Sequence, residues 1–151
     1  MSSKLDFRDT RTMRLLRALV EAREDFGRLD DARIREYGLA TAEFDCLVTL
    51  GVDQPLRMCD LAERSLLTKS HATHVVKRLE EKGLARRERS RQSEREVLVT
   101  LTSAGEALFN EIYPSHYEFL TDYFNARLTE AEQVQLTALL RKLVGSPSRA
   151  E

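Results

Sequence analysis

The feature that most constrains the fold is residues 58–83, where a short helical pattern is followed by a tight connection and a longer helical pattern. The short segment, 58–64, offers Leu61 and Ala62 for burial. The longer segment, 69–82, has apolar residues at the i, i+3, i+4 and i+7 spacing of one helix face, namely Ala72, Val75, Val76 and Leu79. Thr68 is the expected N-cap of the second helix and Gly83 its stop. This arrangement predicts a helix-turn-helix.

The other face of the longer helix carries short polar side chains at the same spacing: Ser70, Thr73, His74 and Lys77. An ordinary surface helix would carry Glu/Lys pairs there, whereas this one has no acidic residue before Glu80. Short hydrogen-bonding side chains allow a helix to approach base edges in a major groove. The face is therefore a candidate reading surface for double-stranded DNA.

After Gly83 the runs LARRER (84–89) and REVLVTL (95–101) flank residues 90–94. In the second run apolar residues alternate with others at 97, 99 and 101, which is the period of a strand. The pattern predicts a β-hairpin with Arg91 at its tip and with Arg89 and Arg95 at its base.

The charge is distributed unevenly along the chain. Between Arg64 and Arg95 there are ten Lys or Arg residues and four Asp or Glu residues, a net charge of +6, while the remainder carries −7. A basic block in an otherwise acidic chain is typical of a surface that binds a polyanion. The alternative interpretation is a solvated charged face.

Helices are also expected on both sides of this region. The first, over 9–37, has an apolar side and ends at Gly38, and it is too long for the core of a small domain alone. A second, over 42–51, is expected with Thr41 as its cap. Capping boxes at 103–106 and 129–132 predict helices over 103–127 and 129–144, with Pro114 kinking or breaking the first of them.

The composition is that of a folded globular chain, with 42% hydrophobic and 32% charged residues among 151. It contains no apolar run of 18 residues, and the first ten residues are polar, so neither a transmembrane helix nor a signal peptide is expected. Two cysteines do not make a disulfide scaffold. We therefore expect a cytoplasmic protein without a membrane partner.

The helix-turn-helix and the hairpin together resemble a known family. The segment LAERSLLTKSHATHVVKRLEEKGLARRERS, with REVLVTLTSAGEAL after the tip, is similar to the winged helix-turn-helix of the MarR family of bacterial transcription regulators. The resemblance extends to TAEFDCLVTL before the motif and to LTEAEQVQLTALLRKL near the end. It implies a mainly α fold with a small β wing, and a homodimer formed by the first helix and the last two.

The resemblance also implies a division of the chain. Residues 1–37 would form an N-terminal dimerisation helix, 38–101 the DNA-binding domain, 102–145 the C-terminal dimerisation helices and 146–151 a flexible tail. One winged domain from each subunit would lie on a pseudo-palindromic operator, and the protein is expected to be a repressor relieved by a small aromatic-acid-like effector.

Site residues follow from the same resemblance. Ser70, Thr73 and His74 would meet base edges, and Lys69 and Lys77 suit phosphates. The wing would contribute Arg89, Arg91 and Arg95. The family usually has an acidic residue two positions before the equivalent of Arg95, where this chain has Ser93, so a bracing ion pair would have to come from Glu94 or be missing.

Effector candidates are Arg87, which matches a position that can bind a carboxylate but could equally hold a phosphate, and His116, which could equally belong to the dimer core together with Tyr113 and Tyr117. His71, His74 and Cys59 lack the further ligands of a metal site. Cys46 is expected in the core, and the first helix, where relatives carry a redox-sensing cysteine, has none.

No catalytic constellation or phosphate loop is present, so an enzyme and a cofactor are not expected. The alternative to a sequence-specific regulator is a dimeric structural or protein-interaction module with only non-specific affinity for DNA.

Overall fold

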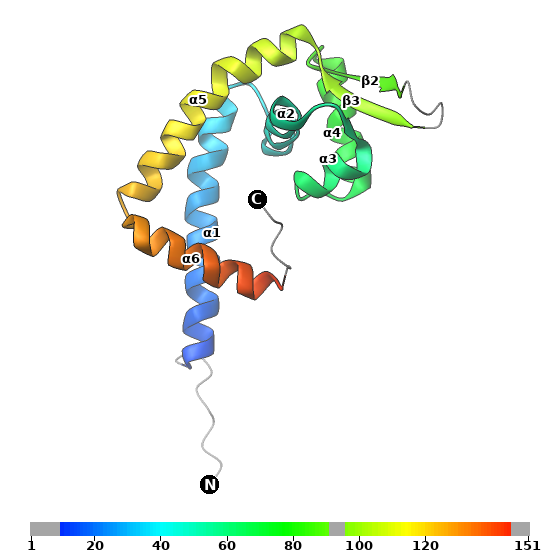
Figure 1. Cartoon of the computed structure of the whole chain (residues 1–151). Coiled ribbons are helices and arrows are strands. Elements are labelled where there is room, and N and C mark those ends of the chain that lie inside the picture. Colours follow the sequence, from blue (N-terminus) through cyan, green and yellow to red (C-terminus); the bar gives the residue numbers. More distant parts are fainter. Residues whose placement is uncertain (1–9, 91–95, 146–151) are drawn as a thin grey trace. The chain divides into compact units, whose positions relative to one another are not determined.

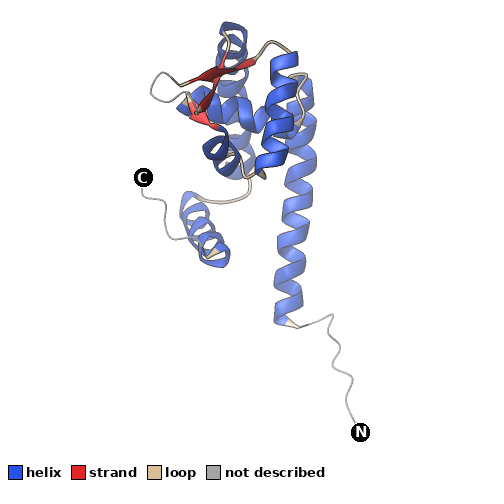
Figure 2. Ribbon diagram, turned by 90° about the vertical axis from the view of Figure 1, so that its right-hand side faces the viewer, coloured by secondary structure: helices blue, strands red, loops and turns tan. Residues whose placement is uncertain are grey.

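The computed structural model of this chain describes residues 10–90 and 96–145 (Figure 1). Within them the elements are α1 (Arg11–Glu36), α2 (Thr41–Asp53), β1 (Leu56–Arg57), α3 (Met58–Arg64), α4 (Lys69–Glu81), β2 (Ala85–Arg89), β3 (Val97–Leu101), α5 (Ser103–Asn125) and α6 (Glu130–Val144). The expected mainly α fold with a small β wing is confirmed (Figure 2).

The chain divides into two compact units, one ending at Phe109 and the other beginning at Asn110. The first unit contains α1 to α4, the sheet and the beginning of α5. The second contains the rest of α5 and α6. No helix in the part of the chain described here has the length and apolar character needed to cross a membrane.

The core of the first unit lies among α2, α3, α4 and the sheet. Its largest fully buried side chains are Ile34, Cys46, Leu47, Leu50, Leu61, Val75, Val76, Leu79 and Val99. Ala72, Val75, Val76 and Leu79 are all buried, which confirms the apolar face predicted for the longer helix of the motif. Burial of these side chains is the main force that holds α4 against the rest of the unit.

The sheet has the strand order β1-β3-β2 and is antiparallel throughout. Ala85 pairs with Leu101 and Arg89 with Val97, so the predicted hairpin is confirmed. The additional strand β1, in which Leu56 pairs with Val99, was not predicted from the sequence. Two residues are too few to show an alternating pattern, and only the pairing with β3 makes them a strand.

Helix caps agree with the sequence in two places. Oγ1 of Thr68 accepts a hydrogen bond of 3.2 Å from the backbone N of His71. The box at Thr129 is complete, because its backbone N donates to Glu132 at 2.8 Å and its hydroxyl accepts from the backbone N of Glu132 at 3.4 Å. Gly38 and Gly83 follow α1 and α4 with φ of 74° and 71°, as helix stops in the left-handed region do.

Two predicted caps are wrong. Thr41 is the first residue of α2 and not its cap, since the N-cap is Ala40 and the Thr41 hydroxyl donates instead to Asp31 of α1. Ser103 likewise belongs to α5. The cap is Thr102, whose hydroxyl accepts from the backbone N of Gly105 at 3.1 Å and donates to the carbonyl of Gly83 at 2.6 Å. In both cases a threonine hydroxyl donates to an acceptor far away in the sequence, Asp31 for Thr41 and the Gly83 carbonyl for Thr102.

Helix α1 begins at Arg11 after the N-cap Thr10, and Asp9 lies outside the described residues. Helix α5 runs from Ser103 to Asn125, so Pro114, which was expected to kink or break it, does not break it.

Candidate nucleic-acid interface

Helix α4 presents the polar face expected of a reading helix. Ser70, Thr73, His74 and Lys77 are exposed, opposite the buried apolar face. The Thr73 hydroxyl donates to the carbonyl of Lys69 at 2.8 Å, which leaves its oxygen lone pair and its methyl group for an external partner. Lys77 lies 3.9 Å from Glu81 in a loose, exposed ion pair that a phosphate could replace.

The turn between α3 and α4 begins with a hydrogen-bonded serine and continues with a leucine of positive φ. Ser65 is buried, and its hydroxyl donates to Oγ1 of Thr49 at 3.1 Å. The next residue, Leu66, has φ of 55° and a side chain that is 92% exposed. A branched side chain is rarely found in the left-handed region, so this turn is locally strained.

Glu43 of α2 ties the C-terminal end of α4 to the core. Its carboxylate is only 3% exposed and accepts hydrogen bonds from Nζ of Lys82 at 2.7 Å and from the backbone N of Ala40 at 3.0 Å. Arg78 approaches the same carboxylate at 3.5 Å. Burial acts to raise the pKa of Glu43, but these bonds and charges outweigh it and the pKa is lowered. A buried carboxylate of α2 therefore holds the C-terminal end of α4.

Arg87 of β2 ties the wing to α4. Its Nε lies 3.1 Å from both carboxylate oxygens of Glu80, and its Nη2 lies 2.5 Å from Oε2. The hydrogen bond with Glu80 raises the pKa of Arg87, and the same bond lowers the pKa of Glu80. This predicted effector residue is thus already bound to a carboxylate of its own chain. The sequence did not indicate the pair, because nothing in the local pattern specifies how β2 returns past α4.

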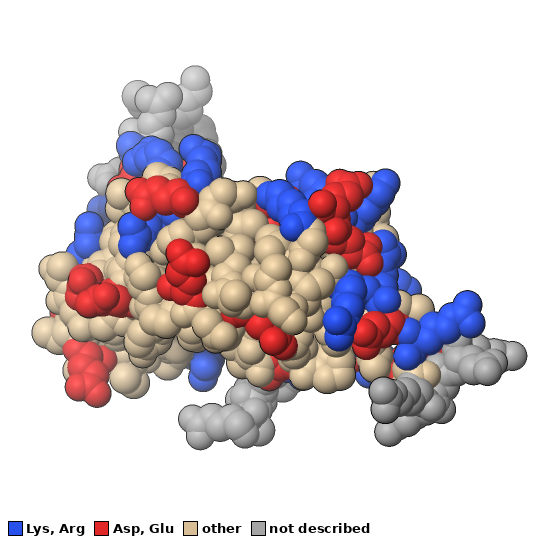
Figure 3. Space-filling model, turned by 90° about the horizontal axis from the view of Figure 1, so that it is seen from above, with Lys and Arg blue, Asp and Glu red and all other residues tan. Residues whose placement is uncertain are grey.

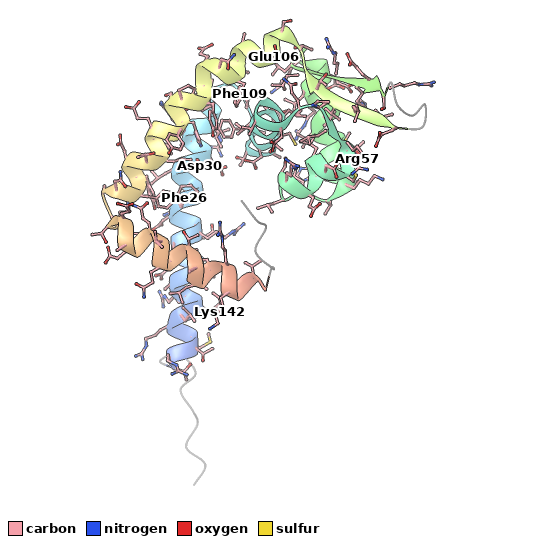
Figure 4. All side chains as sticks on the ribbon, viewed as in Figure 1. Phe26, Asp30, Arg57, Glu106, Phe109 and Lys142 are labelled. Atoms are coloured by element: carbon pink, nitrogen blue, oxygen red, sulfur yellow. The ribbon has the colours of Figure 1, made fainter. Side chains whose placement is uncertain are left out.

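Arg57 of β1 was missed by the sequence reasoning, and it connects α3 with β3. Its Nε lies 2.7 Å from Oδ2 of Asp60 and 3.6 Å from Oε1 of Glu96. The label in Figure 4 shows Arg57 where α3 and the strands meet. The Arg57–Asp60 half of this contact could have been found from the i, i+3 spacing, whereas Glu96 lies far away in the sequence.

Of the three arginines predicted to contact DNA from the wing, only Arg89 lies within the described residues. Arg89 is exposed at the end of β2, as a groove-reaching residue must be. Arg91 and Arg95, with Ser93 and Glu94, lie outside the described residues. Blue lysine and arginine side chains gather over the part of the molecule that carries the wing, at the right of Figure 3, mixed with acidic ones. Within β2, Arg86 pairs with Glu88 at 2.5 Å.

The two cysteines and His116 differ in their exposure and surroundings. Cys46 is fully buried, as predicted, and burial raises the pKa of its thiol to about 11, so it is not poised to react as a thiolate. Cys59 is exposed and lies 3.7 Å from Oδ1 of Asp60. His116 in α5 is 4% exposed, and its ring centroid lies 5.8 Å from that of Phe119.

Two helices carry apolar side chains that the single chain does not cover. On α1 only Ile34 is buried, and on α6 no residue is. The exposed apolar residues of α1 are Met13, Leu15, Leu16, Leu19, Val20 and Leu29, and those of α6 are Val134, Leu136, Leu139, Leu140, Leu143 and Val144. Two such rows are typical of surfaces that bind another protein chain.

Comparison with known proteins places these features in a family. The model of the MarR family matches residues 39–97. An HTH-type transcriptional regulator of Bacillus cereus is 31% identical over 110 residues, which cover 73% of each protein.

Solved structures agree. Sco3205, a MarR family transcriptional regulator from Streptomyces coelicolor whose crystal structure is in complex with DNA, superposes with a TM-score of 0.82 at 28% identity and covers 93% of this chain and 92% of its own. BpsR of Bordetella bronchiseptica, whose DNA binding is regulated by 6-hydroxynicotinic acid, has a TM-score of 0.77 at 26% identity over 96% of this chain and 100% of its own.

Proposed function

Because this chain belongs to the MarR family of transcriptional regulators, which are not enzymes, we propose that it binds a pseudo-palindromic operator sequence-specifically as a homodimer. The observation that carries the proposal is the exposed polar face of α4, which has no acidic residue before Glu80, beside a basic wing. Ser70, Thr73 and His74 contact base edges, while Lys69 and Lys77 contact phosphates. The wing contributes Arg89, Arg91 and Arg95.

The homodimer is supported by the uncovered apolar rows of α1 and α6. A second copy of this chain is the occupant that brings two reading helices to one operator. Replacing Leu139 and Leu143 of α6 by Asp is expected to yield monomers by sedimentation and to abolish selection of paired half-sites. A dimer that persists in this double variant would exclude α6 from the interface.

Selection of bound duplexes from a random pool at physiological salt tests sequence reading. We expect enrichment of an inverted repeat with half-sites about 10 bp apart, or one helical turn. Failure to enrich any sequence, with binding that disappears as salt rises, would favour the protein-interaction module with only non-specific DNA affinity.

Variants then separate base readers from residues that bind phosphates. Thr73→Ala and His74→Ala should change the preference at particular base pairs by about 1–3 kcal/mol for a good contact. Arg89→Ala, Arg91→Ala and Arg95→Ala should each lower the salt slope by about one unit for every phosphate that the arginine neutralises. Lys142→Ala, which removes a cation from α6, is the control and should leave both measurements unchanged.

We further propose that the protein is a cytoplasmic repressor relieved by a small aromatic acid. BpsR supports this, since a compound of that class regulates its DNA binding. Arg87 and His116 are the candidate effector residues. A carboxylate at Arg87 would have to compete with Glu80, which already binds the guanidinium. Titration with hydroxylated benzoates in an operator-release assay tests this, and release that is unaffected by both Arg87→Ala and His116→Ala would exclude these residues.

A further inference from the structure

The side chain of Arg57 contacts both α3 and the wing. No other arginine in the described residues does so. Toward α3, its Nε and Nη2 donate to the two carboxylate oxygens of Asp60 at 2.7 and 3.3 Å. Toward β3, the same Nε lies 3.6 Å from Oε1 of Glu96. One guanidinium therefore connects the first helix of the helix-turn-helix with the strand that returns from the wing tip.

Glu96 lies at the base of the wing hairpin, immediately before β3. Its backbone carbonyl accepts a hydrogen bond of 2.8 Å from the backbone N of Ser90, and this bond closes the base of the hairpin around residues 91–95. A contact that restrains Glu96 therefore also restrains the base of the hairpin. Arg57 contacts it directly.

On the side of the wing near α3, the backbone of β1 pairs with β3. A groove of about 630 Å³ lies there, lined by Arg57 and Asp60 on one side and by Glu88, Ser90 and Glu96 on the other. Arg57 already pairs with Leu98 of β3 through the backbone, and its side chain makes a second connection across the groove, to Asp60 and Glu96. The Arg87–Glu80 pair connects β2 with α4, and the Arg57–Glu96 pair connects β1 with the residue that precedes β3.

We propose that Arg57 is a positioning residue that, through Asp60 and Glu96, sets the orientation of the wing relative to α3. The inference rests on the proposed function only in that the wing contacts DNA. Arg57 lies in β1 and Glu96 immediately precedes β3, so their ion pair joins two segments of the wing at the base of the hairpin. The pKa of Asp60 is lowered, first by its hydrogen bond with Arg57.

Hydrogen exchange of the free protein tests the brace without DNA. In Arg57→Ala we expect faster exchange of the backbone amides of β3 and of Ser90, with no change in α4. Arg64→Ala is the matched control, because Arg64 is also an exposed arginine paired with an acid, Asp53, but has no contact with the wing among the described residues. Unchanged exchange in the wing of Arg57→Ala would overturn the proposal.

The sign of the effect of Glu96→Gln on operator binding separates positioning from charge. Removing a negative charge near DNA should by itself tighten binding. Loss of the brace should instead weaken binding to the selected operator by about threefold to tenfold, within the range of partly exposed ion pairs. Asp60→Asn should act in the same direction, and Arg57→Lys should retain most of the affinity. Tighter or unchanged binding by Glu96→Gln would overturn the proposal.

The two proposals fail in different ways. If the wild-type protein selects no operator while Arg57→Ala still loosens the wing in hydrogen exchange, the DNA-binding proposal fails and the brace stands. If the wild-type protein selects an operator but the wing exchanges equally in Arg57→Ala and wild type, the brace fails and the function stands. Circular dichroism of each variant confirms that it is folded before either comparison is made.

Discussion

The carboxylate of Glu43, in the first turn of α2, accepts a hydrogen bond of 2.7 Å from Nζ of Lys82, the residue that follows α4. Glu43 is only 3% exposed while the Lys82 side chain is 41% exposed, so this bond joins the C-terminal end of α4 to a buried carboxylate of α2. The contact has consequences for stability that can be measured.

Glu43→Ala is expected to lower the free energy of unfolding by about 1–3 kcal/mol, since it leaves the Ala40 amide and two cations without their shared acceptor. Urea denaturation measures this decrease. Glu24→Ala removes an acid from an exposed ion pair with Arg23 and should change stability by less than about 0.5 kcal/mol. Equal effects of the two substitutions would mean that the contact with Lys82 adds nothing.

Gly105 and Gly27 should respond to alanine with opposite signs. A Cβ at Gly105 would overlap the carbonyl oxygen of Leu84, a backbone atom that cannot move aside easily, whereas nothing lies within 4 Å of a Cβ at Gly27. Gly27→Ala in α1 should therefore stabilise by about 0.5–1 kcal/mol, and Gly105→Ala in α5 should destabilise by about 1–3 kcal/mol. Thermal unfolding of both variants checks the pair, and stabilisation by Gly105→Ala would contradict the close approach.

Leu66→Gly is expected to stabilise the turn by up to about 1 kcal/mol, because φ of 55° is strained for leucine and the exposed side chain adds little packing. Leu67→Gly is the matched control in the same turn. Leu67 has no positive φ and is partly buried, so its replacement should destabilise. Chemical denaturation in parallel distinguishes the two, and destabilisation by both would show that the leucine at 66 is needed for packing.

Asp45 should make stability depend on pH. Burial, followed by the charges of Asp30 and Asp31, raises the pKa of Asp45 from 3.8 to about 6. Since folding favours the neutral form, its contribution is present below about pH 4 and is lost as the pH rises through about 6.

Asp45→Asn should therefore stabilise the protein at pH 8 by about 1–3 kcal/mol and have little effect at pH 4. Unfolding free energies across this range test the prediction, with Glu111→Gln, an exposed acid, as the control. A constant difference between Asp45→Asn and wild type at all pH values would contradict it.

Much of the reading helix could be predicted because its signals are local. The spacing of Ala72, Val75, Val76 and Leu79 specified the buried face, and Thr68 and Gly83 specified the ends. Helical periodicity and caps depend on neighbours within about four residues, so they can be recognised without knowledge of the fold. The strand at 97–101 was predictable for the same reason, since alternation is a local property.

The sequence by itself thus determined the long helices, the β-hairpin, the buried face of α4 and the polar face opposite it. Only the tertiary structure decided which charges meet. Glu43 finds Lys82 and Arg57 finds Glu96, each pair 39 residues apart. The fold likewise selected Thr102 over Ser103 as a cap, because the carbonyl of Gly83 lies within its reach. Ion pairs and long-range hydrogen bonds depend on where the packed elements place their side chains, and no local pattern records that placement.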